Sequence, residues 1–166
     1  MPDSGLTRLR VSGRNRDLTS FGGGWQVRDR LLKAVKALPR ITVLRNQSVF
    51  VVDDDLGMLK GLTRLLRQHG YDSVGFSSAE EFQNHGDFES ACCVVLDINL
   101  NNESGIELRH RLKAAGISLP VIYITANDSP AVHMAAIESG CIAYLTKPFR
   151  ARSLIEPIEK AAAEAA

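Results

Sequence analysis

The strongest restriction on the fold of this chain is a regular alternation, from Ser48 onward, of short apolar runs with amphipathic stretches. Most of the apolar runs are four or five residues long and rich in β-branched or aromatic side chains, which indicates buried strands of a parallel sheet. The runs are residues 49–52, 74–76, 92–96, 121–124 and 142–145. The amphipathic stretches are residues 56–66, 78–85, 105–115, 129–139 and 153–164.

The amphipathic stretches predict helices. In the first of them, leucines recur at intervals that place them on one helix face, and Gly70 follows as the expected stop. Five strands, each followed by a helix, predict a doubly wound α/β domain. Of the known doubly wound folds we take the flavodoxin-like one, a (βα)5 sandwich of three layers with a parallel sheet in the order 2-1-3-4-5. In such a fold the functional crevice lies beyond the carboxyl ends of the strands.

Residues 1–47 differ in chemistry from the rest of the chain. They have a net charge of +7, whereas residues 48–166 have a net charge of −6. We interpret them as a basic, flexible extension, with a short helix expected at residues 26–38, ahead of a single domain at residues 48–166. The alternatives are a start codon placed too far upstream, or a basic arm that touches nucleic acid or an acidic partner.

Cysteine usage and apolar run length restrict the location of the protein. Cys92 and Cys93 are adjacent within an apolar run, a pattern typical of reduced, packed thiols in a cytoplasm. No apolar run approaches the roughly 18 to 20 residues that cross a bilayer. The N-terminal arginines are not followed by the apolar stretch of a secretory signal. We therefore expect a cytoplasmic protein without a membrane partner.

Carboxylates follow two of the predicted strands. Asp53, Asp54 and Asp55 come directly after the first strand, and Asp97 follows the third. Strands one and three are neighbours in the order 2-1-3-4-5, so we expect their ends to bring Asp53, Asp54 and Asp97 together. Clustered carboxylates stay ionised only if a cation joins them, and Mg²⁺ suits oxygen ligands beside a phosphate. The alternative is that the three consecutive aspartates only cap the first helix.

A hydroxyl and an ammonium group end two further strands. Thr125 closes the fourth strand, and Lys147 closes the fifth and is followed by Pro148. Both groups could bind phosphoryl oxygens at the same crevice, the lysine as a point charge. Taken singly, each has a simpler interpretation, a cap for Thr125 and a solvated side chain for Lys147. Pro148 is interpreted as a helix start or as the second residue of a cis bond.

Residues 48–160 resemble the receiver domain of bacterial two-component response regulators. The similarity is to chemotaxis-type regulators, and it is close to the receivers of nitrogen-fixation-type regulators. Four motifs carry it, in order: Val-Phe-Val-Val-Asp-Asp-Asp (49–55), Val-Val-Leu-Asp-Ile-Asn-Leu (94–100), Val-Ile-Tyr-Ile-Thr-Ala (121–126) and Tyr-Leu-Thr-Lys-Pro-Phe (144–149). The resemblance implies a phosphorylatable aspartate switch in phosphorelay signal transduction.

The resemblance implies roles for the acidic residues. Asp97 is the phosphoryl acceptor and, together with Asp54, holds Mg²⁺ directly. Asp53 acts on the metal largely through water, and Asn99 contributes its backbone carbonyl. The metal ligands implied are therefore Asp53, Asp54, Asp97 and Asn99.

The resemblance also implies roles for the residues that end later strands. Thr125 and Lys147 contact the phosphoryl group and act with Asp97 as catalytic residues. Tyr144 matches the aromatic residue that rotates inward on activation, with Thr125 as its switch partner. Gly105 matches the glycine that starts the third helix.

Partners follow from the same resemblance. The phosphoryl donor is a sensor histidine kinase or a histidine phosphotransfer protein, and the domain modifies itself without turning over a separate substrate. A downstream effector protein would bind the face built by residues 129–139, 142–145 and 153–164. A homodimer is left open, and any contact with nucleic acid is assigned to residues 1–47 and not to the domain.

Two other functions compete with the phosphorylated switch. One is a receiver-like protein–protein interaction module that is never phosphorylated. The other is a phosphatase of the haloacid dehalogenase type, which needs a carboxylate two residues after the nucleophile, where this chain has Asn99.

The chain also departs from the family pattern. Asn101 stands where the family often has proline, which should loosen the loop after Asp97. Pro157 lies in the first turns of the last predicted helix, where Ser153 and Glu156 could form a capping box, and it is expected to shorten or bend that helix. Only 17 residues follow Phe149, so no output domain is evident.

Overall fold

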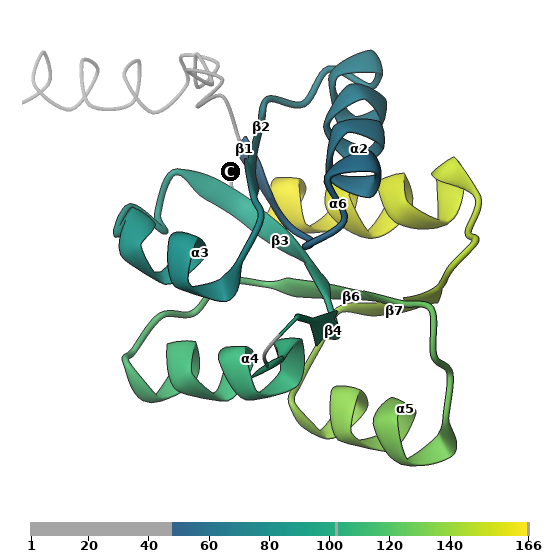
Figure 1. The fold of residues 1–166 in the computed structure, drawn as a ribbon. Helices are drawn as coiled ribbons and strands as arrows, with labels where there is room; N and C mark the ends of the chain where they lie inside the picture. Colours follow the sequence, from purple (N-terminus) through teal and green to yellow (C-terminus); the bar gives the residue numbers. More distant parts are fainter. Residues whose placement is uncertain (1–47, 102, 166) are drawn as a thin grey trace, which may run out of the picture. The chain divides into compact units, whose positions relative to one another are not determined.

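Five parallel strands form the central sheet of the computed structural model, which describes residues 48–101 and 103–165 (Figure 1). The strands are β1 (Ser48–Val52), β2 (Ser73–Phe76), β3 (Ala91–Asp97), β6 (Val121–Thr125) and β7 (Ala143–Thr146). Their order is β2-β1-β3-β6-β7, and every pairing is parallel. This confirms the predicted order 2-1-3-4-5. The predictions for residues 1–47, including the helix at 26–38, lie outside the described residues.

Helices cover both faces of the sheet. They are α2 (Leu56–Gln68), α3 (Ala79–His85), α4 (Gly105–Ala114), α5 (Pro130–Glu138) and α6 (Ala151–Ala165). Figure 1 shows α2 and α6 together on one side and α3, α4 and α5 on the other. The buried residues divide in the same way into two apolar clusters, so the three-layer sandwich is confirmed.

Alternating side chains of the strands supply both clusters. In β1, Val49 and Val51 pack toward α2 and α6, whereas Phe50 and Val52 pack toward the opposite helices. All four side chains are fully buried, as expected for a strand covered on both faces.

The end of α2 follows the sequence prediction. His69 is its last half-helical residue, and Gly70 adopts a left-handed backbone with φ of 82°. The Gly70 N–H donates to the carbonyl of Arg67 at 3.1 Å. A residue with a side chain is strained in this conformation, which explains the glycine.

The last helix corrects two predictions. It begins at Ala151 and not at residue 153, so the proposed capping box is wrong: the Ser153 N–H donates to the Arg150 carbonyl, and the Glu156 carboxylate accepts from Arg152. The helix also runs through Pro157 to Ala165, so Pro157 does not shorten it. A proline removes one backbone donor, and the buried apolar side chains on both sides of it hold the helix on the sheet.

A small hairpin, which the sequence did not predict, follows β3. Its strands are β4 (Asn99–Leu100) and β5 (Glu103–Ser104), paired antiparallel. Asn101 lies in the turn between them, so the segment after Asp97 is paired and folds back toward the start of α4.

Among the described residues, no helix combines the length and apolar character needed to cross a membrane.

Candidate functional site

Three carboxylates meet at the carboxyl end of the sheet. Asp53 and Asp54 follow β1, and Asp97 ends the neighbouring strand β3. Each offers an oxygen atom, and these oxygens all lie within 4.8 Å of one another. Asp53 is fully buried, Asp97 is 6% exposed, and Asp54 is partly exposed. The structure thus brings together the three aspartates that the sequence placed at this edge.

The three consecutive aspartates have different roles: one caps α2, and the other two lie at the carboxylate cluster. Asp55 is the N-cap of α2: its carboxylate accepts from the N–H groups of Gly57, at 2.7 Å, and Met58, at 3.1 Å. Asp53 instead accepts from the Asp55 N–H through one oxygen and faces Lys147 with the other. Helix capping therefore accounts for Asp55 alone, and Asp53 and Asp54 are left for the crevice.

Lys147 joins the two buried carboxylates. Its Nζ donates to Asp53 Oδ2 at 2.8 Å and to Asp97 Oδ2 at 2.7 Å. The backbone N–H of Lys147 donates to the Thr125 carbonyl at 2.7 Å, and the peptide bond between Lys147 and Pro148 is cis. The side chain is 14% exposed, so the solvated-lysine alternative does not describe it.

The charges of this cluster do not balance. Three carboxylates face one ammonium group, and burial raises the pKa of Asp53 although the hydrogen bonds from Lys147 and the Asp55 N–H oppose that rise. For Lys147, burial lowers the pKa, but the bonds to Asp53 and Asp97 outweigh it and leave the pKa raised. Lys147 is thus a fixed cation, and ionised Asp53 lacks full compensation.

A hard divalent cation fits this donor set. The three carboxylates supply oxygen ligands from one side, and the raised pKa of Asp53 indicates that more positive charge would stabilise the ionised form. Asp53, Asp54 and Asp97 could therefore hold a metal ion, with the remaining coordination positions left to water or to a phosphate.

Thr125 lies in a hydrogen-bonded ring beside these charges. Its buried hydroxyl accepts from the Asn99 side-chain amide and from the Asn127 N–H, each at 3.1 Å. It is also within bonding distance of the Asn127 carbonyl, to which it donates at 3.1 Å. The Asn99 N–H donates to Asp97 Oδ1 at 3.1 Å, so Asn99 connects the carboxylate to the hydroxyl.

Sequence reasoning gave Asn99 only a backbone role and missed Asn127. The link from the Asn99 side chain to Thr125 spans 26 residues and leaves no local sequence signal. Asn127, in contrast, stands two residues after a strand-terminal threonine, where hydroxyl-to-backbone turns are common.

Gly105 lies against the backbone of Asp97. A Cβ atom at Gly105 would stand 2.2 Å from the Asp97 carbonyl oxygen, far inside contact distance. The Gly105 N–H also donates to the Ile98 carbonyl at 2.8 Å. The first residue of α4 therefore needs to be glycine for the helix to begin beside the aspartate.

Tyr144 lies against α5 and the loop before it. Its hydroxyl donates to Asp128 Oδ1 at 3.1 Å, and its ring stacks on His133 with a centroid distance of 4.5 Å and an interplanar angle of 9°. The Thr146 hydroxyl donates to the other Asp128 oxygen at 3.3 Å. Sequence reasoning selected Tyr144 but missed Asp128 and His133, whose contacts depend on how α5 packs on β7.

A family comparison covers nearly all of the described residues. The model of the response regulator receiver domain matches residues 49–159. Nodulation protein W of Bradyrhizobium diazoefficiens is 34% identical over 110 residues, which are 66% of this chain and 48% of that protein. The transcriptional regulatory protein TdiR of Thauera aromatica is 34% identical over 119 residues, 70% of this chain and 51% of that protein.

Solved structures agree with this match. The response regulator StyR is 36% identical, with a TM-score of 0.67 over 72% of this chain and 60% of that one. The structure titled FixJ-N is 30% identical, with a TM-score of 0.65 over 70% of this chain and 94% of that one. The chain spans about half the length of the two curated relatives it matches.

Proposed function

Because this chain belongs to the family of response regulator receiver domains, we propose that it accepts a phosphoryl group on Asp97 in the presence of Mg²⁺. The observation that carries the proposal is the bridge that Lys147 makes between the Asp53 and Asp97 carboxylates, with Asp54 beside them. The donor we propose is the phosphohistidine of a sensor histidine kinase or of a histidine phosphotransfer protein.

The Asp97 carboxylate acts as the nucleophile. A bond forms between one of its oxygens and phosphorus while the phosphorus–nitrogen bond of the phosphohistidine breaks, and the leaving imidazole takes up a proton. Asp54, Asp97 and the Asn99 carbonyl would hold Mg²⁺, with Asp53 acting through water, and the ion would supply positive charge for the phosphoryl oxygens. Positioning and charge stabilisation supply the acceleration.

Lys147 and Thr125 stabilise the transferred group. Lys147 Nζ already contacts an Asp97 oxygen, so it follows the charge as it moves onto the phosphoryl oxygens. The Thr125 hydroxyl donates to the Asn127 carbonyl in this structure and would exchange that bond for one to a phosphoryl oxygen. Asn99, bonded to both Asp97 and Thr125, would respond to the same exchange.

Tyr144 carries the change to the surface. When Thr125 moves toward the phosphoryl group, Tyr144 would leave Asp128 and His133 and rotate inward, a population shift between two packings. The surface that changes is made by α5, β7 and α6. Exposed Met134 and Ile137 on α5, and Ile142 before β7, support binding of an effector protein there.

The proposal also covers the location of the protein and its output. We place the protein in the cytoplasm as a self-phosphorylating acceptor, without turnover of a separate substrate. Since the curated relatives are about twice as long as the matched region, the output of this chain depends on a partner or on further sequence. A homodimer and a contact between residues 1–47 and nucleic acid are outcomes to test separately.

Acetyl phosphate with Mg²⁺, read by intact mass, tests the acceptor. We expect one phosphoryl adduct per chain, abolished in Asp97→Asn and retained in Asp55→Asn. Asp55→Asn is the matched control because asparagine caps helices as well as aspartate does. Undiminished labelling of Asp97→Asn would refute the proposal. Absence of labelling in wild type, with beryllofluoride also unbound, would favour the interaction module that is never phosphorylated.

A further inference from the structure

Two adjacent cysteines of β3 lie on the same side of the sheet. Consecutive residues of a strand normally point to opposite faces, yet Cys92 and Cys93 both belong to the apolar cluster under α2 and α6. The cause is a bulge: Ser48 pairs with Ala91 and Val49 with Cys93, so Cys92 is an extra residue without a partner position in β1. Bulges re-aim side chains in this way.

The bulge places the two thiol groups next to each other. Their Sγ atoms are 3.8 Å apart, and both side chains are buried. The hydrogen bond with Cys93 lowers the pKa of the Cys92 thiol, whereas that bond and burial raise the pKa of Cys93. Cys92 is therefore the more acidic thiol of the pair. Cys141, the third cysteine of the chain, lies in the other apolar cluster.

Adjacency prevents these thiols from closing an unstrained disulfide. The peptide bond between them is trans, since the cis bond found in the described residues is the one between Lys147 and Pro148. Neighbouring Cα atoms across a trans peptide are about 3.8 Å apart, and disulfides need about 4.4 to 6.8 Å. The two sulfurs are therefore kept as free thiols that an atom larger than sulfur can bridge.

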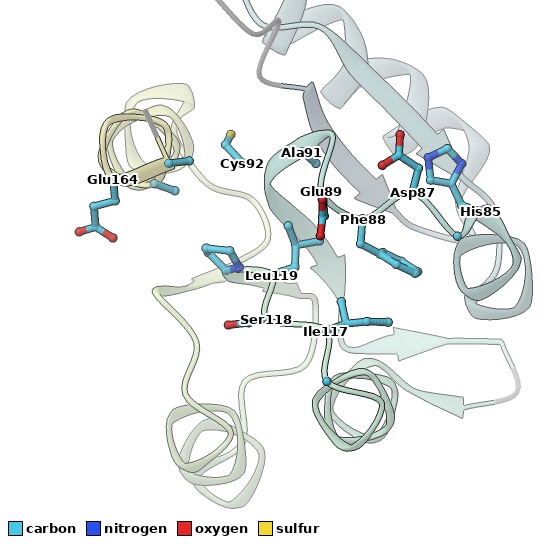
Figure 2. Close-up of a pocket in the computed structure, with 15 residues that line it drawn as sticks. His85, Asp87, Phe88, Glu89, Ala91, Cys92, Ile117, Ser118, Leu119 and Glu164 are labelled. Atoms are coloured by element: carbon cyan, nitrogen blue, oxygen red, sulfur yellow. The ribbon is translucent and has the colours of Figure 1, made fainter.

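A cavity reaches Cys92 from the end of the sheet opposite the aspartates. It has a volume of about 1130 Å³ and is lined by residues 85–89, 91, 92, 116–120, 161, 164 and 165 (Figure 2). Cys92 is one of the lining residues, and Figure 2 shows its sulfur turned away from Leu119. A small ligand in the cavity would lie against Cys92, whose Sγ is 3.8 Å from that of Cys93.

We infer that Cys92 and Cys93 form a vicinal dithiol site for a soft, thiophilic centre that binds two sulfurs at once, of the trivalent organoarsenic class. With an arsenoxide, two arsenic–sulfur bonds form, the arsenic–oxygen bond breaks, and the oxygen leaves as water with both thiol protons. No atom changes oxidation state, so the step needs no oxidant or reductant. The paired geometry favours chelation because little orientational freedom is lost on binding.

Phenylarsine oxide is the probe for this site. We expect the full-length wild-type chain to gain one adduct by intact mass, to retain it through a wash with excess monothiol, and to release it to a dithiol. Cys141→Ser is the matched control and should behave like wild type, because a single thiol does not hold the probe through the wash. Cys92→Ala and Cys93→Ala should each lose the retained adduct.

Peptide mapping of the wild-type adduct keeps the test independent of whether the variants fold. Mapping to the peptide that contains residues 92 and 93 supports the inference. It is overturned by mapping to Cys141, by the absence of a retained adduct, or by undiminished retention in folded Cys92→Ala. Formation of a Cys92–Cys93 disulfide by hydrogen peroxide in the native protein would also overturn it.

Discussion

A largely buried cation lies near each end of the central sheet, and the two differ in what they bind. At the carboxyl end, Lys147 donates to two carboxylates from two other strand ends. At the amino end, the 8%-exposed Arg109 of α4 donates through Nη1 to the neutral Leu119 carbonyl at 2.8 Å, and its Nε has no partner among the described residues. Burial alone therefore does not distinguish a reactive site.

The difference lies in whether charges share the site. Lys147 is one member of a cluster whose negative charge exceeds its positive charge, so the cluster could hold a metal ion. Arg109 bonds α4 to Leu119, two residues before β6, and stands beside no carboxylate at ion-pair distance in the part of the chain that the structure describes. One basic residue, Lys147, is thus part of the candidate site, whereas the other, Arg109, only holds two elements of the fold together.

Replacing each cation by methionine tests this contrast most strongly. In Mg²⁺-free buffer at neutral pH, Lys147→Met should lower the free energy of unfolding by about 3–5 kcal/mol, because two buried carboxylates lose their partner. Arg109→Met removes one hydrogen bond to a neutral acceptor and should cost about 1 kcal/mol. Urea denaturation measures both. Equal costs would break the comparison.

Two glycine substitutions test how tightly the backbone is packed at the carboxyl end of the sheet. Gly105→Ala should destabilise the fold by about 1–3 kcal/mol, because the new Cβ would meet the Asp97 carbonyl oxygen. Gly61→Ala in α2, where nothing lies within 4 Å of the new Cβ, should stabilise it by about 0.5–1 kcal/mol. Thermal denaturation distinguishes the two signs, and stabilisation by Gly105→Ala would contradict the close contact.

Stability against pH tests the uncompensated charge on Asp53. Its pKa is raised in the folded protein above the ordinary value of 3.8. The folded state therefore binds this proton more tightly, and the contribution of Asp53 to stability falls as the pH rises through the raised pKa. The unfolding free energy of wild type minus that of Asp53→Asn should decrease as the pH rises above the ordinary pKa of 3.8 in Mg²⁺-free buffer. Saturating Mg²⁺ should shrink the decrease, and a flat or rising difference would refute it.

The smallest expected effect concerns the hydrogen bond from Tyr144 to Asp128. Tyr144→Phe removes the hydrogen bond to Asp128 and keeps the stack on His133. The loss, about 0.5–1.5 kcal/mol, should raise the inward population several-fold before phosphorylation. Chemical shifts of the α5 amides, measured without and with beryllofluoride, report the population. Shifts of the unmodified variant that match the unmodified wild type would show that Asp128 does not hold the ring.

The periodicity of the sequence predicted the strands and the helices because burial on both faces of a parallel sheet produces continuous apolar runs. The strand order came from the flavodoxin-like fold that this alternation matches. It also placed Asp53, Asp54 and Asp97 at one edge, since parallel strands end there together. The hairpin of β4 and β5 was missed because two-residue strands have no periodicity. The start of α6 was misplaced because Ser153 and Glu156 match a capping pattern that a helix beginning at Ala151 does not use.

Side-chain partners distant in sequence were beyond sequence reasoning. Asn99 meets Thr125, and Tyr144 meets both Asp128 and His133, only after β6, β7 and α5 have packed. Composition and spacing identify which groups are present in the site, but the hydrogen bonds that orient them depend on rotamers set by the whole fold.

The position of β7 at the edge of the sheet has a consequence for local opening. Within residues 48–101 and 103–165, β7 pairs with β6 alone, whereas β1, β3 and β6 each have two neighbouring strands. Fewer backbone bonds must break to separate β7 than to separate any inner strand. Tyr144 lies on this strand and Lys147 directly follows it, so hydrogen exchange should find the amides around both residues opening more often than those around Asp97, which ends the central strand.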